Sequence, residues 1–315
     1  MPNTSKTKNS VTKKALVIGG AGFIGSHLTD ALIKDGYEVL VFDNLSNGKK
    51  ENVNKKAVLQ VGDIRNAEDL KKAFMYLGPG VCVFHLACLP RVQFSIDFPR
   101  ESHDANINGT LNVLLASHEG KANRVIYSAS SSAYGDQDVL PLVETMKPNP
   151  KSPYALQKHT GELYAKVAFE AYGLGTVCLR YFNVYGPRQE PDGSYAQAIP
   201  KFIGQRKKGI SITITGDGKQ TRDATHVSDV VRANMLAAKS KKVGKGEVIN
   251  IGSGKNHSVL KLAALIGGPV VHIEARLEPR NTQADIRLAK KLLGWVPKVT
   301  LEKGIKELKK LSGLK

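Results

Sequence analysis

The residues best placed to do chemistry in this 315-residue chain begin with a glycine-rich turn. Gly20, Gly22 and Gly25 form a G-x-G-x-x-G pattern, and a second set beginning at Gly19 overlaps it. Glycines at such positions let the backbone turn sharply and approach a pyrophosphate, which binds the free N–H groups at the start of a helix. The turn therefore predicts a site for a dinucleotide. A glycine turn without a ligand is the alternative.

The second reactive group is a tyrosine and a lysine four residues apart, Tyr154 and Lys158. Pro153 suits the first turn of a helix, and the spacing puts both side chains on one face of it. A lysine beside a phenol favours the phenolate and lowers its pKa, although a shift from ~10 to neutrality takes about 4 kcal/mol. Because serines at 130–132 follow a preceding strand, we expect Ser130, Tyr154 and Lys158 to be catalytic rather than a half-exposed helix pair.

The elements around the glycines must position them. A short apolar strand, Ala15–Ile18, precedes the turn, and a helix with an apolar face follows it. The next strand ends at Asp43, whose carboxylate would accept a ribose 2′-hydroxyl and repel a 2′-phosphate. Strand, glycines, helix, strand and acid in this order predict NAD as the cofactor.

Strand-like and helical segments alternate through the first part of the chain, which predicts parallel strands with helices on both faces. The expected strands are Ala15–Ile18, Val39–Phe42, Val58–Val61, Val81–Leu86, Arg124–Ser128 and Thr176–Arg180, with Val248–Ile251 as a later addition. The expected helices include Ala67–Leu77, Asn106–His118 and Tyr154–Tyr172. The predicted fold is α/β, a Rossmann-type doubly wound parallel sheet with a smaller C-terminal substrate-binding lobe.

The regular alternation of strands and helices ends after residue 182, where loop sequences and shorter elements begin. We expect a flexible leader over 1–13 and an NAD-binding domain over 14–182, to which 221–252 returns. The substrate lobe would comprise 183–220 and 253–315. It would contain a helix at Ile199–Lys207, a strand at Ser211–Thr215 and a final helix at Leu301–Leu311.

The net charge of +18 and the pI near 9.7 raise the question of a nucleic-acid partner. Lysines are densest at 239–245 and 290–315. Basic and aromatic residues are not interleaved and no known nucleic-acid module is present, so the lysines predict a solvated basic surface that attracts an anionic substrate, and no nucleic-acid partner is expected. No apolar run reaches the ~20 residues of a membrane helix, and no secretory signal opens the chain. Three cysteines without metal-ligand spacing predict a cytoplasmic protein with no metal site.

A longer series of motifs resembles the extended short-chain dehydrogenase/reductase family, and within it the UDP-glucose and UDP-N-acetylglucosamine 4-epimerases. The motifs are Gly19-x-x-Gly22-x-x-Gly25, Asp43-Asn-Leu-Ser-Asn-Gly48, Gly62-Asp-Ile-Arg65, His85-Leu-Ala87, Asn106-Ile-Asn-Gly-Thr110, Ser130, Tyr154 with Lys158, Arg180-Tyr-Phe-Asn-Val-Tyr-Gly-Pro-Arg-Gln189, Arg222-Asp223 and Leu293-Gly-Trp-x-Pro297. Two departures are Cys88, where a second alanine is common, and Ala224, where an aromatic residue is usual.

The resemblance implies two sets of binding residues and a homodimer formed through helices 106–118 and 154–172. The cofactor set is Gly19, Gly22, Phe23, Ile24, Gly25, Asp43, Asn44, Asp63, Ile64, Leu86, Ala87, Asn106 and Lys158. Within it, Asp63 and Ile64 would hold the adenine, and Asn106 the nicotinamide half. The UDP-sugar set is Ser130, Ser131, Asn183, Gln197, Thr213, Arg222, Arg276 and Thr282. Arg222 would clamp the diphosphate, while the register of Arg276 stays open.

The implied reaction is inversion of C4 of a UDP-hexose through a 4-keto sugar. No acid follows Ser130 before Tyr134, whereas the related dehydratases carry an acidic pair there. Another NAD-dependent UDP-sugar enzyme (a UDP-glucuronate epimerase, a decarboxylase or a dehydratase), a net oxidoreductase and a non-catalytic dinucleotide- or RNA-binding protein remain alternatives. The sequence leaves the preferred hexose open. The small Thr282 would admit an N-acetyl group at C2, unless it only caps the following helix.

Overall fold

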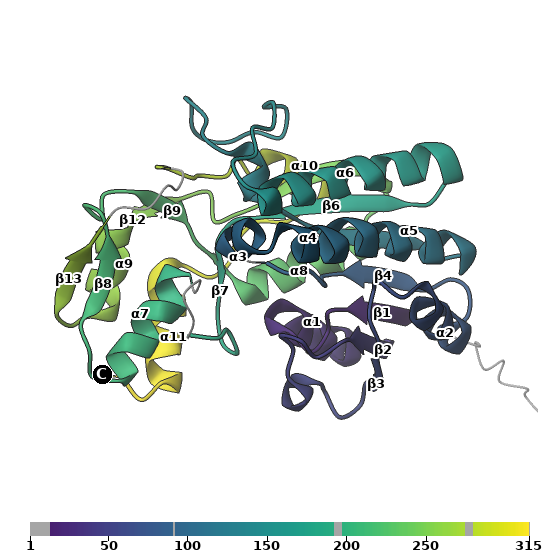
Figure 1. Ribbon diagram of the computed structural model, residues 1–315, viewed down its shortest axis with the longest axis horizontal. Helices are drawn as coiled ribbons and strands as arrows, with labels where there is room; N and C mark the ends of the chain where they lie inside the picture. The colour runs from purple at the N-terminus through teal and green to yellow at the C-terminus, as the bar shows by residue number, and fades with distance from the viewer. Residues whose placement is uncertain (1–12, 91, 192–196, 275–279, 315) are drawn as a thin grey trace, which may run out of the picture.

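The computed structural model describes residues 13–90, 92–191, 197–274 and 280–314. Of the expected leader, only Lys13 lies within these ranges, and Arg276 lies outside them. Helices pack on both faces of a central sheet, and a smaller lobe lies beyond one end of the strands (Figure 1). Among the described helices, none is long and apolar enough to cross a membrane.

The central sheet has seven strands, all parallel, in the order β11-β6-β5-β4-β1-β2-β3. Their bounds are β1 Lys14–Ile18, β2 Glu38–Asp43, β3 Val58–Val61, β4 Cys82–His85, β5 Arg124–Ser130, β6 Thr176–Tyr181 and β11 Lys245–Ile251. The order reverses between β1 and β4, which is where open sheets of this kind bind ligands. The predicted doubly wound parallel sheet is confirmed.

Both faces of the sheet are buried, because β1 sends alternate residues into two separate cores. Ala15 and Val17 join the core that α1, α8 and α10 cover, while Leu16 and Ile18 join the core under α2, α5 and α6. These helices span α1 Phe23–Lys34, α2 Ala67–Leu77, α5 Gly109–Glu119, α6 Pro153–Tyr172, α8 Val227–Lys239 and α10 Arg287–Leu293.

The smaller lobe has its own apolar core, formed by helices that pack around three short strand pairs (Figure 1). Its helices are α7 Ala198–Lys207, α9 Val259–Ile266 and α11 Leu301–Leu311. The pairs are β8 Ile212–Thr215 with β13 Val270–Ile273, β9 Thr221–Asp223 with β12 Asn256–Ser258, and β7 Val184–Tyr185 with β10 Thr225–His226. The last pair connects the lobe to the carboxyl end of the sheet, directly after β6.

Short helical turns fill the connections near the carboxyl edge. They are α3 Val92–Asp97, α4 Pro99–His103 and the single turns Lys50–Asn52, Asp104–Asn108 and Ser131–Tyr134. The turn at Asp104–Asn108 is π-helical, so the helix expected at Asn106–His118 begins with a wider turn before α5. Wide turns of this kind often mark functional sites.

The expected domain division differs from the structure in two places: β9, within the expected return at 221–252, pairs with β12 of the lobe, and α10 with Trp295 packs on the nucleotide domain. α10 and Trp295 fall within 253–315, yet their side chains join the core of the nucleotide domain. The Trp295 indole donates a hydrogen bond to the Asp229 carbonyl of α8, 2.9 Å away. The Asp229 carboxylate in turn accepts bonds from the backbone N–H groups of Lys298 and Val299. These contacts attach 287–299 to α8, so only the segments on either side of them belong to the lobe.

Candidate active site

A cleft of about 1450 Å³ lies at the carboxyl ends of the parallel strands and extends into the lobe. The predicted site residues that line it are Gly19, Gly22, Phe23, Ile24, Gly25, Asp43, Asn44, Asp63, Ile64, Leu86, Ala87, Ser130, Ser131, Tyr154, Lys158, Asn183, Gln197, Thr213, Arg222 and Thr282. Asn106 is the one described residue of the two predicted sets that does not line it.

The glycine-rich turn has a shape that only glycine allows. Gly19 has φ +83°, and a Cβ there would lie 2.6 Å from the Ala87 nitrogen. A Cβ on Gly25 would lie 2.1 Å from the Gly19 carbonyl oxygen. Gly22 precedes α1 without a side-chain cap, and the first turn of α1 holds no acid. The free N–H groups of this helix start therefore fit the pyrophosphate of a dinucleotide.

Asp43 lies at the carboxyl end of β2 and faces the same turn. Its buried carboxylate accepts hydrogen bonds from the backbone N–H groups of Ala21, at 2.9 Å, and Leu45, at 2.8 Å. A carboxylate can accept about four hydrogen bonds, so it can still accept a ribose hydroxyl. This arrangement fits the unphosphorylated ribose of NAD.

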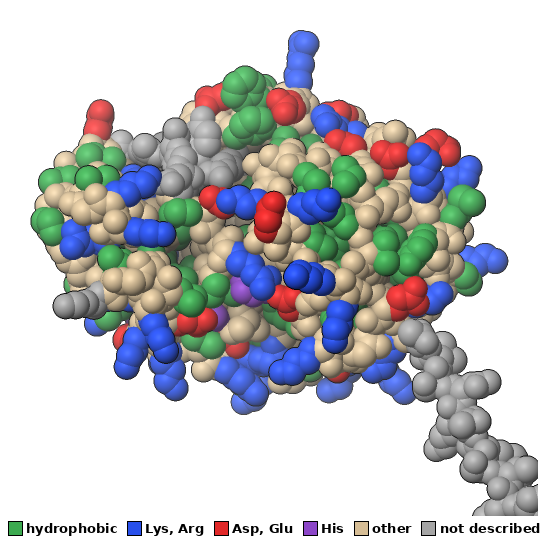
Figure 2. Space-filling view, turned by 90° about the horizontal axis from the view of Figure 1, so that it is seen from below, with side chains coloured by type: hydrophobic (Ala, Val, Ile, Leu, Met, Phe, Trp, Pro, Cys, Tyr) green, Lys and Arg blue, Asp and Glu red, His purple; other side chains and the backbone are tan. Residues whose placement is uncertain are grey.

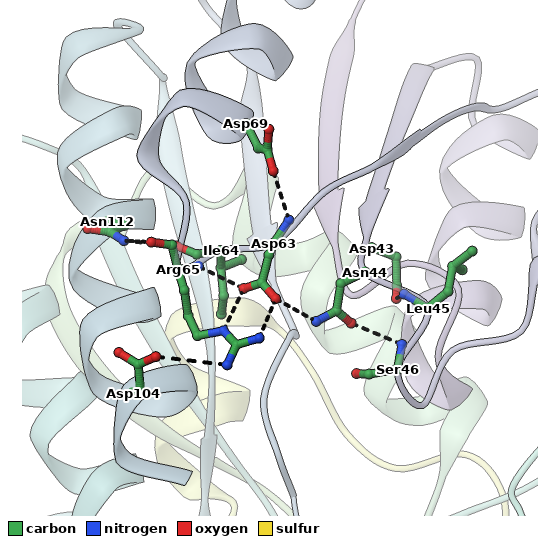
Figure 3. A network of polar contacts seen from close by, with 10 residues as sticks. All are labelled: Asp43, Asn44, Leu45, Ser46, Asp63, Ile64, Arg65, Asp69, Asp104 and Asn112. Carbon is green, nitrogen blue, oxygen red and sulfur yellow. Dashed lines mark hydrogen bonds and ion pairs between the residues drawn. The ribbon is translucent and has the colours of Figure 1, made fainter. Parts of the chain in front are cut away.

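Asp63, the predicted adenine residue, is the centre of a polar network (Figure 3). Its carboxylate accepts bonds from the Arg65 backbone N–H at 2.9 Å, from Arg65 Nε at 3.0 Å and Nη2 at 2.7 Å, and from Asn44 Nδ2 at 2.9 Å. The Arg65 guanidinium holds the pKa of Asp63 well below its usual range. The bond between Asn44 and Asp63 joins the ends of β2 and β3 in one cleft wall, and Arg65, absent from the predicted site set, also lines the cleft.

Asn106 lies behind the cleft wall and contacts the loop that forms it. Its amide accepts a bond from the Leu89 N–H at 2.8 Å and donates to the Leu89 carbonyl at 3.2 Å and to Gln157 Oε1 at 2.8 Å. The side chain is buried, and these bonds fix the loop that carries Leu86 and Ala87. The structure therefore gives Asn106 a supporting position one layer away from the predicted nicotinamide contact.

The predicted catalytic residues converge on one side of the cleft. The Ser130 hydroxyl hydrogen-bonds the Tyr154 phenol, and the Ser132 hydroxyl donates to Ser130 at 2.9 Å. Lys158 Nζ donates to the Ser128 carbonyl at 2.7 Å instead of to Tyr154. Removal of the Tyr154 hydroxyl from water raises its pKa, and the Ser130 bond opposes that rise. The expected lowering by Lys158 is thus not the dominant effect in this structure.

An aromatic layer lies beneath Lys158. Lys158 is only 3% exposed as a residue, and its ammonium lies 5.0 Å from the centre of the Tyr127 ring, a cation–π distance. The His85 ring lies 5.5 Å from the same ring, and burial beside Lys158 lowers its pKa to about 3. A Cβ on Gly161 would lie 2.2 Å from the Tyr127 hydroxyl oxygen, so glycine is required there. Sequence patterns did not single out Tyr127, because an aromatic residue in a buried strand is ordinary.

On the lobe side, Asn183 and Thr282 lie together. The backbone of Asn183 has φ +30°, which is uncommon for a residue other than glycine. Such backbone conformations cluster at functional sites. The Asn183 amide donates to the Asp223 carbonyl at 3.0 Å and to Thr282 Oγ1 at 3.4 Å. Asp285, not Thr282, accepts the N–H of Arg287 at the start of α10. The capping alternative for Thr282 is therefore wrong, and its hydroxyl belongs to the cleft wall.

The other lobe residues have defined partners. Gln197 precedes α7 and accepts a bond from Gln189 Nε2 at 3.3 Å. The Thr213 hydroxyl and N–H both bond to the Gln205 amide, at 2.8 and 3.1 Å. Arg222 Nη1 donates to the Thr221 carbonyl at 2.9 Å. Ser131 is half-buried beside Ser130. These side chains form the wall opposite the glycine turn.

Residues 186–190 cross from the lobe to the nucleotide domain. His27 hydrogen-bonds the Pro187 carbonyl at 2.9 Å, and Arg188 pairs with Asp30 at 2.8 Å. A third link joins Lys49 and Glu190 at 2.5 Å. The partners are 141 to 160 residues apart in the chain, so no local pattern could reveal them.

The chain belongs to the NAD dependent epimerase/dehydratase family, whose model matches residues 15–252. The family resemblance inferred from the motifs is confirmed, and NAD is the cofactor.

Among solved structures, the chain is similar to a UDP-glucose 4-epimerase from Thermotoga maritima with UDP-glucose, with 41% identity and a TM-score of 0.89 over 94% of this chain and 97% of that one. It is also similar to a UDP-N-acetylglucosamine 4-epimerase from Methanobrevibacter ruminantium M1 in complex with UDP-N-acetylmuramic acid, with 38% identity and a TM-score of 0.89 over 95% and 97%. A third relative has another activity: a UDP-N-acetyl-alpha-D-glucosaminuronate decarboxylase from Bacillus cytotoxicus is 34% identical over 94% of this chain and 96% of its own length.

Proposed function

We propose that this chain is an epimerase that inverts C4 of a UDP-hexose. The observation that carries the proposal is that Ser130, Tyr154 and Lys158 line one cleft, with Lys158 one helical turn after Tyr154 on α6. This set lines the same cleft as the glycine-rich turn, so it faces the end of a dinucleotide bound there. Its residue types suit removal and return of a hydroxyl proton.

In this mechanism Tyr154, as the phenolate, takes the proton from the sugar O4 and later returns it. The Ser130 hydroxyl orients O4 and the Tyr154 oxygen. The glycine-rich turn and Asp43 would hold NAD⁺, which would supply the reversible hydride transfer at C4 that epimerisation requires. The Lys158 ammonium favours the phenolate through its charge and keeps its place through Ser128 and Tyr127. Arg222 would hold the diphosphate while the 4-keto sugar turns over.

The residues after Ser130 favour epimerisation over elimination. Ser131, Ser132 and Ala133 carry no acid, and dehydration needs one to move protons at the neighbouring carbons. The next acid along the chain, Asp136, lines the cleft but is exposed. Proton transfer at O4 needs no further group, so the set at hand suffices for epimerisation.

The lobe wall supports a substrate with or without an N-acetyl group. Thr282 is small, its hydroxyl is engaged by Asn183, and it lines the cleft. We propose that it borders the C2 substituent, so that both UDP-glucose and UDP-N-acetylglucosamine fit. Thr282→Tyr should suppress turnover of the N-acetylated sugar selectively, and an equal loss for both sugars would refute this placement.

A decarboxylase or UDP-glucuronate epimerase is the competing function, because relatives of both kinds are similar to this chain. The decisive experiment incubates the purified chain with UDP-glucose, UDP-N-acetylglucosamine and UDP-glucuronate, and identifies the products by NMR. We expect the C4 epimers of the first two sugars, with no net NADH. Release of carbon dioxide from UDP-glucuronate, or accumulation of NADH, would overturn the proposal. Tyr154→Phe with NAD bound is the inactive control.

We further propose a homodimer in the cytoplasm. Leu156, Leu163 and Val167 lie on one face of α6 and are each at least 50% exposed. This apolar stripe fits a helix pair from a second copy, as the resemblance implies. The three free thiols suit a reducing compartment. Light scattering should give twice the mass of 34.1 kDa, and Leu163→Glu should give the monomer.

A further inference from the structure

A second charged surface lies at the amino edge of the sheet, opposite the cleft. We call it the basic edge and define it as eight exposed lysines: Lys13, Lys34, Lys239, Lys241, Lys242, Lys245, Lys290 and Lys291. The sequence spreads them over almost 280 positions. The fold brings them together because α1, α8 and α10 all end at this edge, where β1 and β11 begin.

Contacts across the basic edge show that it is one continuous surface. Lys239 and Lys13 both lie near Asp35, at 2.8 and 3.9 Å. Lys242 Nζ donates to the Lys291 carbonyl at 3.3 Å, which joins the end of α8 to α10. Among the residues that the structure describes, Lys34, Lys241, Lys242, Lys245, Lys290 and Lys291 have no ion pair.

Helix dipoles account for only part of this charge. A lysine in the last turn of a helix offsets the partial negative charge of the free carbonyls there. Lys34, Lys239, Lys290 and Lys291 have such positions, at the ends of α1, α8 and α10. Lys241, Lys242 and Lys245 lie beyond the end of α8, and the carboxylate of nearby Glu247 already accepts two backbone N–H groups. The positive charge of these three lysines is therefore available to an anionic partner.

The chemistry of the surface favours a phosphate backbone over a lipid bilayer. Of the large hydrophobic side chains exposed in the described part of the chain, none lies on α1, α8 or α10 or between α8 and β11. Nothing on this surface could therefore insert into a membrane. Lysines with solvated amines act as point charges, which suit a nucleic acid read by its phosphates and not by its bases.

We propose that the basic edge binds the phosphodiester backbone of nucleic acid, without sequence preference. This revises the expectation of a merely solvated basic surface, since lysines from the separate segments at 13, 34, 239–245 and 290–291 form one patch only in the folded chain. Lysine and arginine side chains outnumber acidic ones on the face shown in Figure 2, so the field around the molecule assists approach. The proposal does not depend on the epimerase function.

The test measures binding of a labelled DNA duplex and an RNA of equal length by fluorescence anisotropy, between about 50 and 200 mM salt. One variant carries Lys241→Glu, Lys242→Glu, Lys290→Glu and Lys291→Glu. The matched control carries Lys303→Glu, Lys306→Glu, Lys309→Glu and Lys310→Glu on α11, with the same change in net charge. We expect the first variant to weaken binding at least tenfold and to lower the salt slope by about four. The control should lose much less.

Saturating NAD and UDP-glucose should leave nucleic-acid binding unchanged, because the cleft lies at the other edge of the sheet. Displacement by these ligands would place the nucleic acid in the cleft and overturn the proposal. Equal losses in the two variants, no binding by the wild-type chain at low salt, or binding only to anionic vesicles would overturn it as well. Wild-type turnover in both variants shows that they are folded.

Discussion

The two edges of the central sheet differ in whether their polar side chains are buried and hydrogen-bonded or exposed to solvent. At the carboxyl edge, buried polar side chains are held by fixed hydrogen bonds, as in the Asp43 contacts with Ala21 and Leu45. At the amino edge, lysines are exposed, and six of the eight in the basic edge have no ion pair among the described residues. The carboxyl edge therefore fixes the positions of its polar groups, whereas the amino edge exposes positive charge to solvent.

The difference explains which substitutions matter. Burial removes a polar group from water, and its fixed hydrogen bonds offset that cost. Removing a partner therefore leaves an unsatisfied buried atom, which destabilises the fold. Exposed lysines remain hydrated, and losing one changes the local stability little. Turnover should therefore respond steeply to changes at the carboxyl edge and hardly at all to changes at the basic edge.

The largest effect is expected from Tyr154→Phe. The change removes only the hydroxyl that would exchange a proton with the sugar, so turnover should fall by roughly 10²–10⁴-fold. Fold and NAD content should remain, as checked by circular dichroism and by release of NAD on denaturation. Turnover near the wild-type rate would remove Tyr154 from the mechanism.

Asp43 sets the next largest effect. Its carboxylate should make NAD bind at least about 30-fold more tightly than NADP, which corresponds to about 2 kcal/mol of repulsion of the 2′-phosphate. Titration calorimetry on the NAD-free protein measures both affinities. Asp43→Asn removes the charge and keeps one of the two backbone bonds, because an amide has a single acceptor oxygen, and it should narrow the ratio of NAD to NADP affinity. Equal affinity for NAD and NADP in the wild type would contradict this placement of the ribose.

His85 predicts how stability changes with pH. Its pKa is about 3 in the fold and about 6.5 in the unfolded chain, so the unfolded chain binds more protons between these values. Stability is therefore full above pH 6.5 and falls as the pH drops toward 3. From pH 7 to 5 this histidine alone should cost about 2 kcal/mol. His85→Gln keeps a hydrogen-bond partner for Thr110. In urea unfolding, the loss of stability of this variant between pH 7 and 5 should be smaller than that of the wild type by this amount.

The Tyr127 ring should matter through Lys158. Tyr127→Leu removes the aromatic face under the ammonium, worth about 1 kcal/mol, so turnover should fall about fivefold and the pH profile should move to higher pH. Tyr127→Phe keeps the ring and deletes a hydroxyl that has no hydrogen-bond partner, so it should match the wild type. Identical pH profiles for the Leu and Phe variants would reduce the ring to a packing role.

The smallest effect is expected at the basic edge. The variant with Lys241, Lys242, Lys290 and Lys291 changed to glutamate should keep wild-type turnover, and thermal unfolding should show a modest change in stability. A large loss of turnover would break the contrast between the two edges, because it would couple the lysines to the cleft.

The sequence by itself determined the parts that depend on local pattern. Gly19, Gly22 and Gly25 are needed where backbone approaches backbone, and the order of strand, turn and acid defines the nucleotide half. Alternating and helical periodicities predicted each of the seven strands and fixed α2 and α11 to the residue. Short apolar runs between glycines and charged residues suffice for this, because strands buried on both faces have that composition.

Only the tertiary structure decided contacts between residues far apart in the chain. It placed Asn106 behind Leu89, turned Lys158 toward Ser128, attached α10 and Trp295 to the nucleotide domain, and gathered scattered lysines into the basic edge. Local pattern specifies which element a residue occupies, while the crossovers of the sheet determine which elements become neighbours. The packing and hydrogen-bond partners of a side chain depend on which elements lie next to it.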